Sequence, residues 1–237
     1  MDPSARAMYP SRLVAMNAAA WKLTTTIFHD RSTRRPPDRR LRTEGPPMTS
    51  DGEKMSPSRR EPMANQQQLV DLFGAGNITS LDAEDRELFA SAGIVADELF
   101  DVGLPDKLSG FFVLEPAAEP EAFDGVRATL DGDEVTLVTL GAPHPDSGLR
   151  YYLNPVDGHV LLAQLDGGRP RLEVVNSTLG AFVDYLYRIG RFKAFRRDAN
   201  EALQADYKDL LIAYLTARDP QAYAQPDNWW PLAVDNL

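Results

Sequence analysis

The middle of the chain, from residue 111 to residue 175, consists of short apolar runs separated by turn-forming dipeptides. In 149–154, apolar and polar side chains alternate, as is typical of a strand buried on one face. The loops between runs, such as Asp157-Gly158, are too short for parallel neighbours, which need a crossover of about a dozen residues. The pattern therefore predicts an antiparallel sheet of about six strands, at Phe111–Leu114, Val126–Leu130, Glu134–Leu140, Leu149–Leu153, His159–Leu165 and Leu172–Val175.

After the strands, the period of the apolar positions changes to that of a helix. Residues 176–178 form a cluster of capping side chains, and apolar residues follow at i, i+3, i+4, i+7 and i+10 from Leu179. This spacing predicts a helix that lies on the sheet. A similar spacing from Leu203 to Tyr214 predicts a second helix with a buried face.

A shorter helix is predicted before the strands. Asp82 is a good N-cap for a helix over Ala83–Ala92, which Gly93 ends, and Leu88 and Phe89 are expected to point inward. With helices at both ends and hairpin-connected strands between them, the predicted fold class is α+β, with a central antiparallel sheet flanked by N-terminal and C-terminal helices.

The first 62 residues differ in composition from the remainder. They contain 12 Lys and Arg against 7 Asp and Glu, are rich in proline and have no sustained apolar period. Such a segment buries too little apolar surface to offset the entropy of ordering it. Its one apolar stretch, Leu13–Phe28, lacks the cleavage site of a signal peptide. We expect residues 1–62 to be a disordered basic leader, or an extension before a true start at Met48, Met55 or Met63, and residues 63–237 to form one domain.

Composition narrows the class of protein further. The chain has 43% hydrophobic residues and a formal net charge of −10, which is typical of a globular protein. Without cysteine it can form no disulfide, thiolate nucleophile or Cys-ligated metal site. No apolar run reaches the length of about 18 residues that spans a membrane, and the acidity argues against direct contact with nucleic acid. We expect a cytoplasmic protein, and the sequence leaves its oligomeric state open.

No catalytic constellation stands out in the sequence. The motifs of phosphate-binding loops, nucleophile elbows and zinc proteases are absent. His144 and His159 lie beside turn residues, which favours a hairpin loop for the first and a strand edge for the second. Residues 131–134 resemble the start of a calcium loop but lack its later ligands. We therefore expect a protein that is not an enzyme, with no catalytic residue, no cofactor and no metal.

Carboxylates are dense in the loops and strand ends of the predicted sheet. They are either solubilising charge or a docking surface for a basic partner, whose association the summed negative potential would steer. The candidate partner-binding residues are Glu115, Glu119, Glu121, Asp124, Asp131, Asp133 and Glu134.

Several short motifs follow one another in a distinctive order. Residues 102–105, Val-Gly-Leu-Pro, lead into Phe111-Phe112, and a predicted strand ends at Leu140-Gly141. Further on come 152–160 and 175–183, and the chain ends with Asp219-Pro220-Gln221-Ala222 and Trp229-Trp230. In this order the motifs resemble the fourth family of the SUKH superfamily, over residues 94–237.

The resemblance implies a bacterial immunity protein with a SUKH-like α+β domain, which binds and neutralises a cognate polymorphic toxin. It further implies a toxin of the nuclease or nucleic-acid deaminase type, whose active-site surface is expected to be basic, and an acidic domain suits such a partner. The alternative is an intracellular regulatory or scaffold protein of the same fold.

Overall fold

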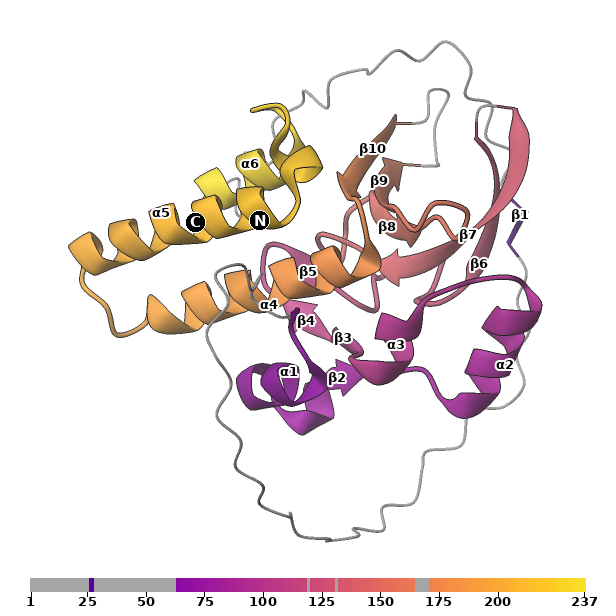
Figure 1. Ribbon diagram of the computed structural model, residues 1–237, viewed down its shortest axis with the longest axis horizontal. Helices are drawn as coiled ribbons and strands as arrows, with labels where there is room; N and C mark the ends of the chain where they lie inside the picture. The colour runs from indigo at the N-terminus through magenta and orange to yellow at the C-terminus, as the bar shows by residue number, and fades with distance from the viewer. Residues whose placement is uncertain (1–25, 28–62, 119, 131, 165–170) are drawn as a thin grey trace, which may run out of the picture. The chain divides into compact units, whose positions relative to one another are not determined.

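The computed structural model describes residues 26–27, 63–118, 120–130, 132–164 and 171–237 (Figure 1). By its contacts the chain divides into two units, one made of Met1–Phe28 with Met63–Leu237 and the other of His29–Pro62. All described residues belong to the first unit. Of the predicted leader, residues 1–25 and 28–62 lie outside the described residues.

The first unit contains helices before and after its main run of strands (Figure 1). The α-helices are α1 (Gln66–Phe73), α2 (Ala83–Ser91), α3 (Asp97–Asp101), α4 (Leu179–Phe195), α5 (Glu201–Arg218) and α6 (Trp229–Asp235), with short 3-10 turns η2 (Ala75–Asn77) and η3 (Pro220–Tyr223). The strands are β1 (Thr26–Ile27), β2 (Ile78–Thr79), β3 (Leu104–Pro105), β4 (Lys107–Leu108), β5 (Phe112–Val113), β6 (Gly125–Leu130), β7 (Asp133–Gly141), β8 (Arg150–Leu153), β9 (Val160–Gln164) and β10 (Arg171–Asn176).

The predicted α+β fold is confirmed. The main sheet has the order β1-β6-β7-β8-β9-β10, and every pair of neighbours is antiparallel. Its hairpins turn where the sequence places glycine, because Gly132 and Gly158 have φ of 99° and 76°, a region that side chains with a Cβ rarely adopt. Short loops thus set the register, as the dipeptides predicted.

One predicted strand lies elsewhere. Residues Phe111–Leu114 form β5, which pairs with β4 in a separate two-stranded sheet. The apolar run there reflects burial, because Phe111 and Phe112 both point into the core. The edge of the main sheet is β1 instead, with Thr26 opposite Arg127 and Ile27 opposite Val126. Thr26 and Ile27 lie within the predicted leader.

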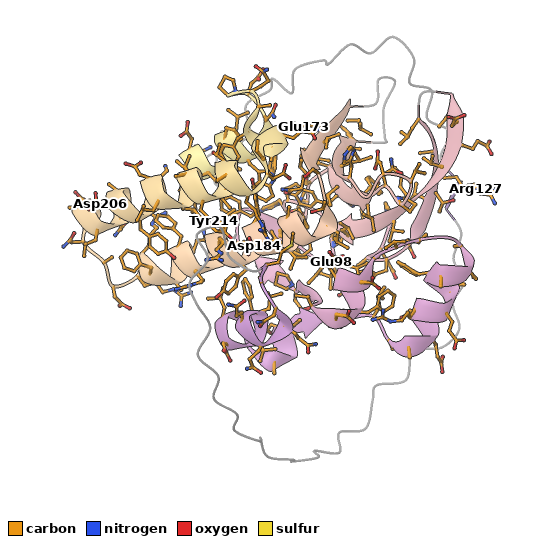
Figure 2. The ribbon with its side chains drawn as sticks, in the orientation of Figure 1. Glu98, Arg127, Glu173, Asp184, Asp206 and Tyr214 are labelled. Atoms are coloured by element: carbon orange, nitrogen blue, oxygen red, sulfur yellow. The ribbon has the colours of Figure 1, made fainter. Side chains whose placement is uncertain are left out.

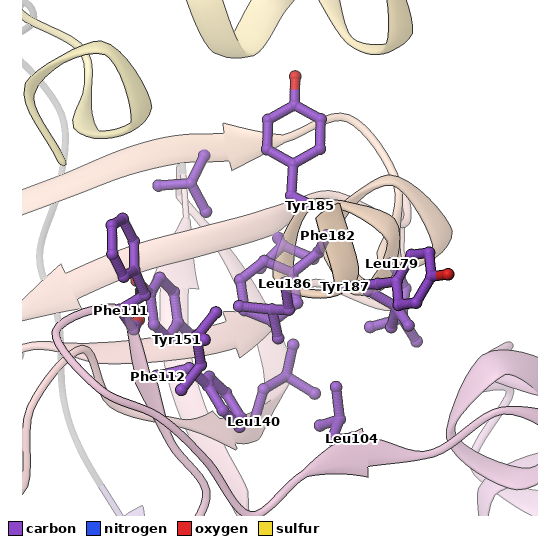
Figure 3. Close-up of a cluster of buried hydrophobic side chains, with 14 of the residues drawn as sticks. Leu104, Phe111, Phe112, Leu140, Tyr151, Leu179, Phe182, Tyr185, Leu186 and Tyr187 are labelled. Atoms are coloured by element: carbon purple, nitrogen blue, oxygen red, sulfur yellow. Dashed lines mark hydrogen bonds between the residues drawn. The ribbon is translucent and has the colours of Figure 1, made fainter. Parts of the chain in front are cut away.

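Helix α4 lies on the sheet and supplies the centre of the core (Figure 3). It begins as predicted, because the N-cap Thr178 accepts a hydrogen bond from Ala181 N at 3.1 Å. Phe182 is fully buried, and the centroid of its ring lies 5.0 Å from that of Tyr151 on β8 and 5.9 Å from that of Phe112 on β5. Aromatic packing therefore joins helix, sheet and the small β4–β5 hairpin.

Helix α2 forms where it was predicted, but only one of the two side chains expected to point inward is buried. Asp82 caps it through hydrogen bonds from Glu84 N and Asp85 N. Phe89 is buried, and its ring lies 5.7 Å from that of Phe100, whereas Leu88 is 60% exposed. The inward position predicted for Leu88 is wrong, because adjacent helical residues point about 100° apart and Phe89 already faces the core.

Helix α5 runs antiparallel beside α4, and its first half lies next to the part of α4 that extends past the sheet (Figure 1). Only Leu211 and Leu215 on α5 are buried. The predicted buried face is therefore wrong at Leu203 and Leu210, which are 50% and 70% exposed. Apolar spacing identified the helix correctly, but the layer that would cover its first half is absent from the described residues.

Candidate functional site

The predicted acidic docking residues in the loop before β6 are partly engaged in forming that loop. Glu115 and Glu121 are exposed, whereas Asp124 is half-buried. Its Oδ2 accepts a hydrogen bond from Glu121 N at 2.9 Å, and its carbonyl accepts one from Thr139 N at 2.9 Å. Asp124 thus stabilises the turn into the sheet.

The other acidic candidates lie at the far end of the β6–β7 hairpin. Asp133 and Glu134 are exposed and begin β7 opposite Leu130 and Thr129. Strand β6 has six residues, so at about 3.3 Å per residue its two ends are about 17 Å apart. The structure does not bring the two acidic groups together, and Glu119 and Asp131 lie outside the described residues.

Neither predicted histidine faces a pocket of carboxylates. His144 is in a loop, where its Nδ1 accepts a hydrogen bond from Asp146 N at 3.3 Å. His159 precedes β9, and its Nδ1 lies 3.1 Å from Asp157 Oδ2 within the same hairpin. Among the described residues, no group of three or more His, Asp or Glu side chains is placed to hold a metal ion.

A cluster of polar and charged side chains surrounds a buried carboxylate on α4. Asp184 is fully buried, and its Oδ2 accepts a hydrogen bond from Tyr214 Oη at 2.7 Å (Figure 2). Its Oδ1 accepts one from Ala64 N at 3.2 Å, and the Nε atoms of Arg188 and Arg218 lie 3.4 Å and 3.5 Å from its two oxygens. Burial, and next the bond to Asp184, raise the pKa of Tyr214 to about 12. The cluster holds α5 and the start of the domain against α4.

A second buried carboxylate joins the end of the sheet to the C-terminal segment. Asp219 Oδ2 accepts hydrogen bonds from Ser177 N at 2.7 Å and from Asn176 Nδ2 at 3.1 Å. Trp230 Nε1 in turn donates to Asn176 Oδ1 at 2.9 Å. The motif residues at 175–183, 219–222 and 229–230 are therefore one structural network, which needs no ligand.

Glu173 on β10 supplies a pH-dependent contact with the C-terminal helix. Its Oε1 accepts a hydrogen bond from Trp229 N at 2.6 Å. Burial raises the pKa of Glu173 from 4.5 to about 7; this hydrogen bond lowers it, and the nearby charge of Asp227 adds a smaller increase.

The folded state consequently holds a proton between pH 4.5 and about 7 that the unfolded state releases. The contribution of Glu173 to stability is full below pH 4.5 and is lost as the pH rises to about 7. Glu173→Gln, which stays neutral, is expected to gain roughly 1–3 kcal/mol relative to the parent between pH 5 and pH 8. Urea unfolding of both chains across that range measures this, with exposed Glu87→Gln as control; a difference independent of pH would contradict it.

An exposed apolar surface lies along the seam between α4 and α5. Leu203, Tyr207 and Leu210 are spaced i, i+4 and i+7 on α5 and so share a side of that helix. The ring of Phe195, at the end of α4, packs 4.9 Å from that of Tyr207 and is 37% exposed. We call Phe195, Leu203, Tyr207 and Leu210 the arm face. The spacing of Leu203, Tyr207 and Leu210 predicted a buried stripe, so the sequence pattern did not indicate an exposed surface here.

Charged and aromatic side chains border the arm face. Asp206 and Asp209 are exposed on α5, and Figure 2 shows Asp206 toward the N-terminal end of that helix. On the α4 side, the Arg188 guanidinium lies over the Tyr214 ring at 4.2 Å. Tyr and Arg are enriched where protein interfaces gain most of their binding energy. The arm face thus combines exposed apolar side chains with charged neighbours, as protein interfaces do.

Comparison with known protein families adds the deciding observation. Residues 64–236 match the model of the SUKH-4 immunity protein family. The chain belongs to that family. The match spans α1 to α6, and it confirms the resemblance carried by the motifs. No curated protein and no solved structure matches the chain.

Membership of the SUKH-4 immunity protein family gives the protein its general role, toxin immunity, with a cognate toxin as its partner. The family is one of immunity proteins and not of enzymes. Among the described residues, no helix combines the length and the apolar character needed to cross a membrane.

Proposed function

We propose that the protein neutralises its cognate toxin by stoichiometric binding through the arm face. The exposure of Leu203 and Leu210 on α5 is the observation that carries this proposal, because these two leucines on one helix face are 50% and 70% exposed. Apolar side chains of this kind contribute binding energy when a partner buries them. Tyr207 beside them is of a residue type that is enriched among the residues that dominate protein interfaces.

Charge supports a basic partner. Residues 63–237 are more acidic than the chain as a whole, since they contain 28 Asp and Glu against 13 Lys and Arg, a net charge of −15 compared with −10 for all 237 residues. Asp206 and Asp209 place two of these carboxylates beside the leucines on α5, whereas the exposed Arg196 and Arg197 follow Phe195 at the end of α4. A toxin of the nuclease or nucleic-acid deaminase type has a basic surface for phosphates, and the α5 side of the arm face, with its neighbouring carboxylates, would dock against such a surface.

We assign the acidic residues around the sheet a role in the rate of association and not in the strength of binding. Glu115, Glu121, Asp133 and Glu134 are exposed and distributed over two places at the ends of β6. Separated charges of this kind act at long range, so they would speed the encounter with a basic toxin without holding it. Charge-neutral variants at these positions should slow association and leave dissociation unchanged.

The proposal is tested with the toxin encoded by the neighbouring gene. Leu203→Asp with Leu210→Asp should weaken binding by about 100-fold, or about 2.7 kcal/mol, because buried carboxylates would replace apolar anchors in the interface. Titration calorimetry measures the affinity, and growth after coexpression with the toxin measures protection.

Two exposed valines elsewhere in the domain provide the matched control for the two leucines. Val95 and Val156 are 74% and 76% exposed and lie away from α5, in the α2–α3 connection and the β8–β9 hairpin. Val95→Asp with Val156→Asp should keep full affinity. If this pair abolishes binding and the α5 pair does not, the arm face is not the docking surface. Absence of any binding by the parent chain would overturn the proposed function itself.

A further inference from the structure

The arm face carries opposite charges on its two helices. On α5, the exposed Asp206 lies three residues after Leu203 and four before Leu210, so it shares their side of the helix. On α4, the exposed Arg191 lies four residues before Phe195 and shares its side in the same way. The α5 edge of the arm face is therefore acidic, and the α4 edge is basic.

Asp206 and Arg191 lie at about the same level along the two helices. The ring of Tyr207, the neighbour of Asp206 in sequence, packs with its centroid 5.5 Å from that of Phe192, the neighbour of Arg191. The Arg191 guanidinium lies over the Tyr187 ring at 5.8 Å, and neither Arg191 nor Asp206 forms an ion pair with another described residue. Both charges are exposed and available to a partner.

The neighbouring charges do not reverse this division. Asp209 is exposed three residues after Asp206 and adds to the acidic edge. Lys208 donates a hydrogen bond to the carbonyl of Asp235 at 3.0 Å and so faces the C-terminal segment. In the loop between α4 and α5, Arg197 and Asp198 are both exposed, and their charges offset each other.

A second copy of this chain has the charges that match such a face. In a twofold dimer the same surface of both copies meets, and an axis along the seam between α4 and α5 places α5 of each copy over α4 of the other. Each Asp206 then faces Arg191 of the other copy, and the exposed leucines leave water. We infer that two copies pair in this way in the absence of toxin and that the toxin displaces the second copy, an inference that rests on the proposed function because both partners use the arm face.

The small size of the arm face limits the strength of this pairing. Its apolar part consists of Phe195, Leu203, Tyr207 and Leu210, far fewer than the roughly 20–30 residues that each side contributes to a standard interface. The dimer is therefore weak and forms at high protein concentration. A weak dimer gives way to a toxin that binds tightly, because bound toxin removes the free surface from the equilibrium.

Sedimentation equilibrium of the full chain without toxin, from about 1 μM to about 1 mM, measures the pairing. The average mass should rise with concentration toward that of two chains. Arg191→Glu and, separately, Asp206→Arg should each raise the dissociation constant of the dimer at least about tenfold, because two attractive pairs become repulsive. Lys107→Glu, at an exposed position on β4, is the matched control and should leave the constant unchanged.

An equimolar mixture of the Arg191→Glu chain and the Asp206→Arg chain tests the arrangement of the helices. In a mixed dimer the introduced glutamate faces the introduced arginine, and the unchanged Asp206 faces the unchanged Arg191. The mixture should therefore recover the dissociation constant of the parent to within about threefold, as should a chain that carries both substitutions. Single variants that pair as well as the parent, or a mixture that does not recover, would overturn the placement of α5 over α4.

Addition of toxin separates this inference from the proposed function. Toxin should convert the dimer into complexes of one chain with one toxin, and Arg191→Glu should not weaken toxin binding, because a basic toxin gains nothing from that arginine. A parent chain that is monomeric up to about 1 mM but binds toxin through the arm face overturns the inference alone. A parent chain that pairs but binds no toxin overturns the proposed function, and a complex of two paired chains with two toxins overturns the displacement.

Discussion

Asp184→Ala is expected to lower the free energy of unfolding by about 3–5 kcal/mol, because removing one partner leaves buried charges uncompensated. Asp184 is fully buried and receives Tyr214 Oη, Ala64 N and two arginines. Without the Asp184 carboxylate, the hydroxyl, the amide and the two guanidinium groups would remain largely buried but would have lost the acceptor that they share. Urea unfolding followed by circular dichroism measures the loss.

Two controls separate this loss from general effects of truncation. Glu87→Ala, at an exposed position on α2, should change stability by less than about 0.5 kcal/mol. Tyr214→Phe removes the shortest hydrogen bond to Asp184 and keeps the ring under Arg188, so it should cost about 1–2 kcal/mol. An Asp184→Ala chain as stable as the Glu87→Ala chain would show that the cluster does not hold the helices together.

Trp230→Ala should destabilise the protein by about 4 kcal/mol, within the range for removal of a large buried aromatic side chain. Trp230 is fully buried, with ring centroids 6.2 Å from Phe182 and 5.2 Å from Tyr185. Its loss would leave a cavity between α4 and the C-terminal segment and free Asn176 from its donor. Thermal and urea unfolding both report the change.

Trp230→Phe is the matched variant, since it keeps one six-membered ring and removes the five-membered ring of the indole together with its Nε1–H donor. It should cost about 2–3 kcal/mol, from the hydrogen bond to Asn176 and from the smaller loss of buried volume. Equal losses for the two variants would contradict the packing explanation. They would mean that the hydrogen bond to Asn176, and not the volume of the indole, joins the C-terminal segment to the sheet.

The local features of the fold were predictable from the sequence. Alternating apolar residues and Gly-containing turns located β6 to β10, and the capping residue Thr178 located the start of α4. These are short-range effects, in which a residue's neighbours along the chain determine its conformation. The separate pairing of β5 with β4 depends on contacts far along the chain, which no local pattern contains.

The surfaces were harder to predict. Leu203 and Leu210 have the spacing of a buried stripe, and whether such a stripe faces the core or a partner depends on how far the neighbouring layer reaches. Asp184 could have been noticed as a single carboxylate inside the apolar run of α4, a pattern typical of a buried, paired charge. Its partners Tyr214 and Arg218 lie on another helix, so only the structure could identify them.

Titration of the purified cognate toxin with the purified protein tests the central claim most directly. Stoichiometric binding predicts that toxin activity falls linearly and reaches zero at one molecule of protein per molecule of toxin. The chain with Leu203→Asp and Leu210→Asp, which should bind about 100-fold more weakly, should inhibit less at the same concentrations. Inactivation by far less than an equimolar amount would show turnover by the protein, and full activity in the presence of excess protein would show no neutralisation; either result would contradict the account.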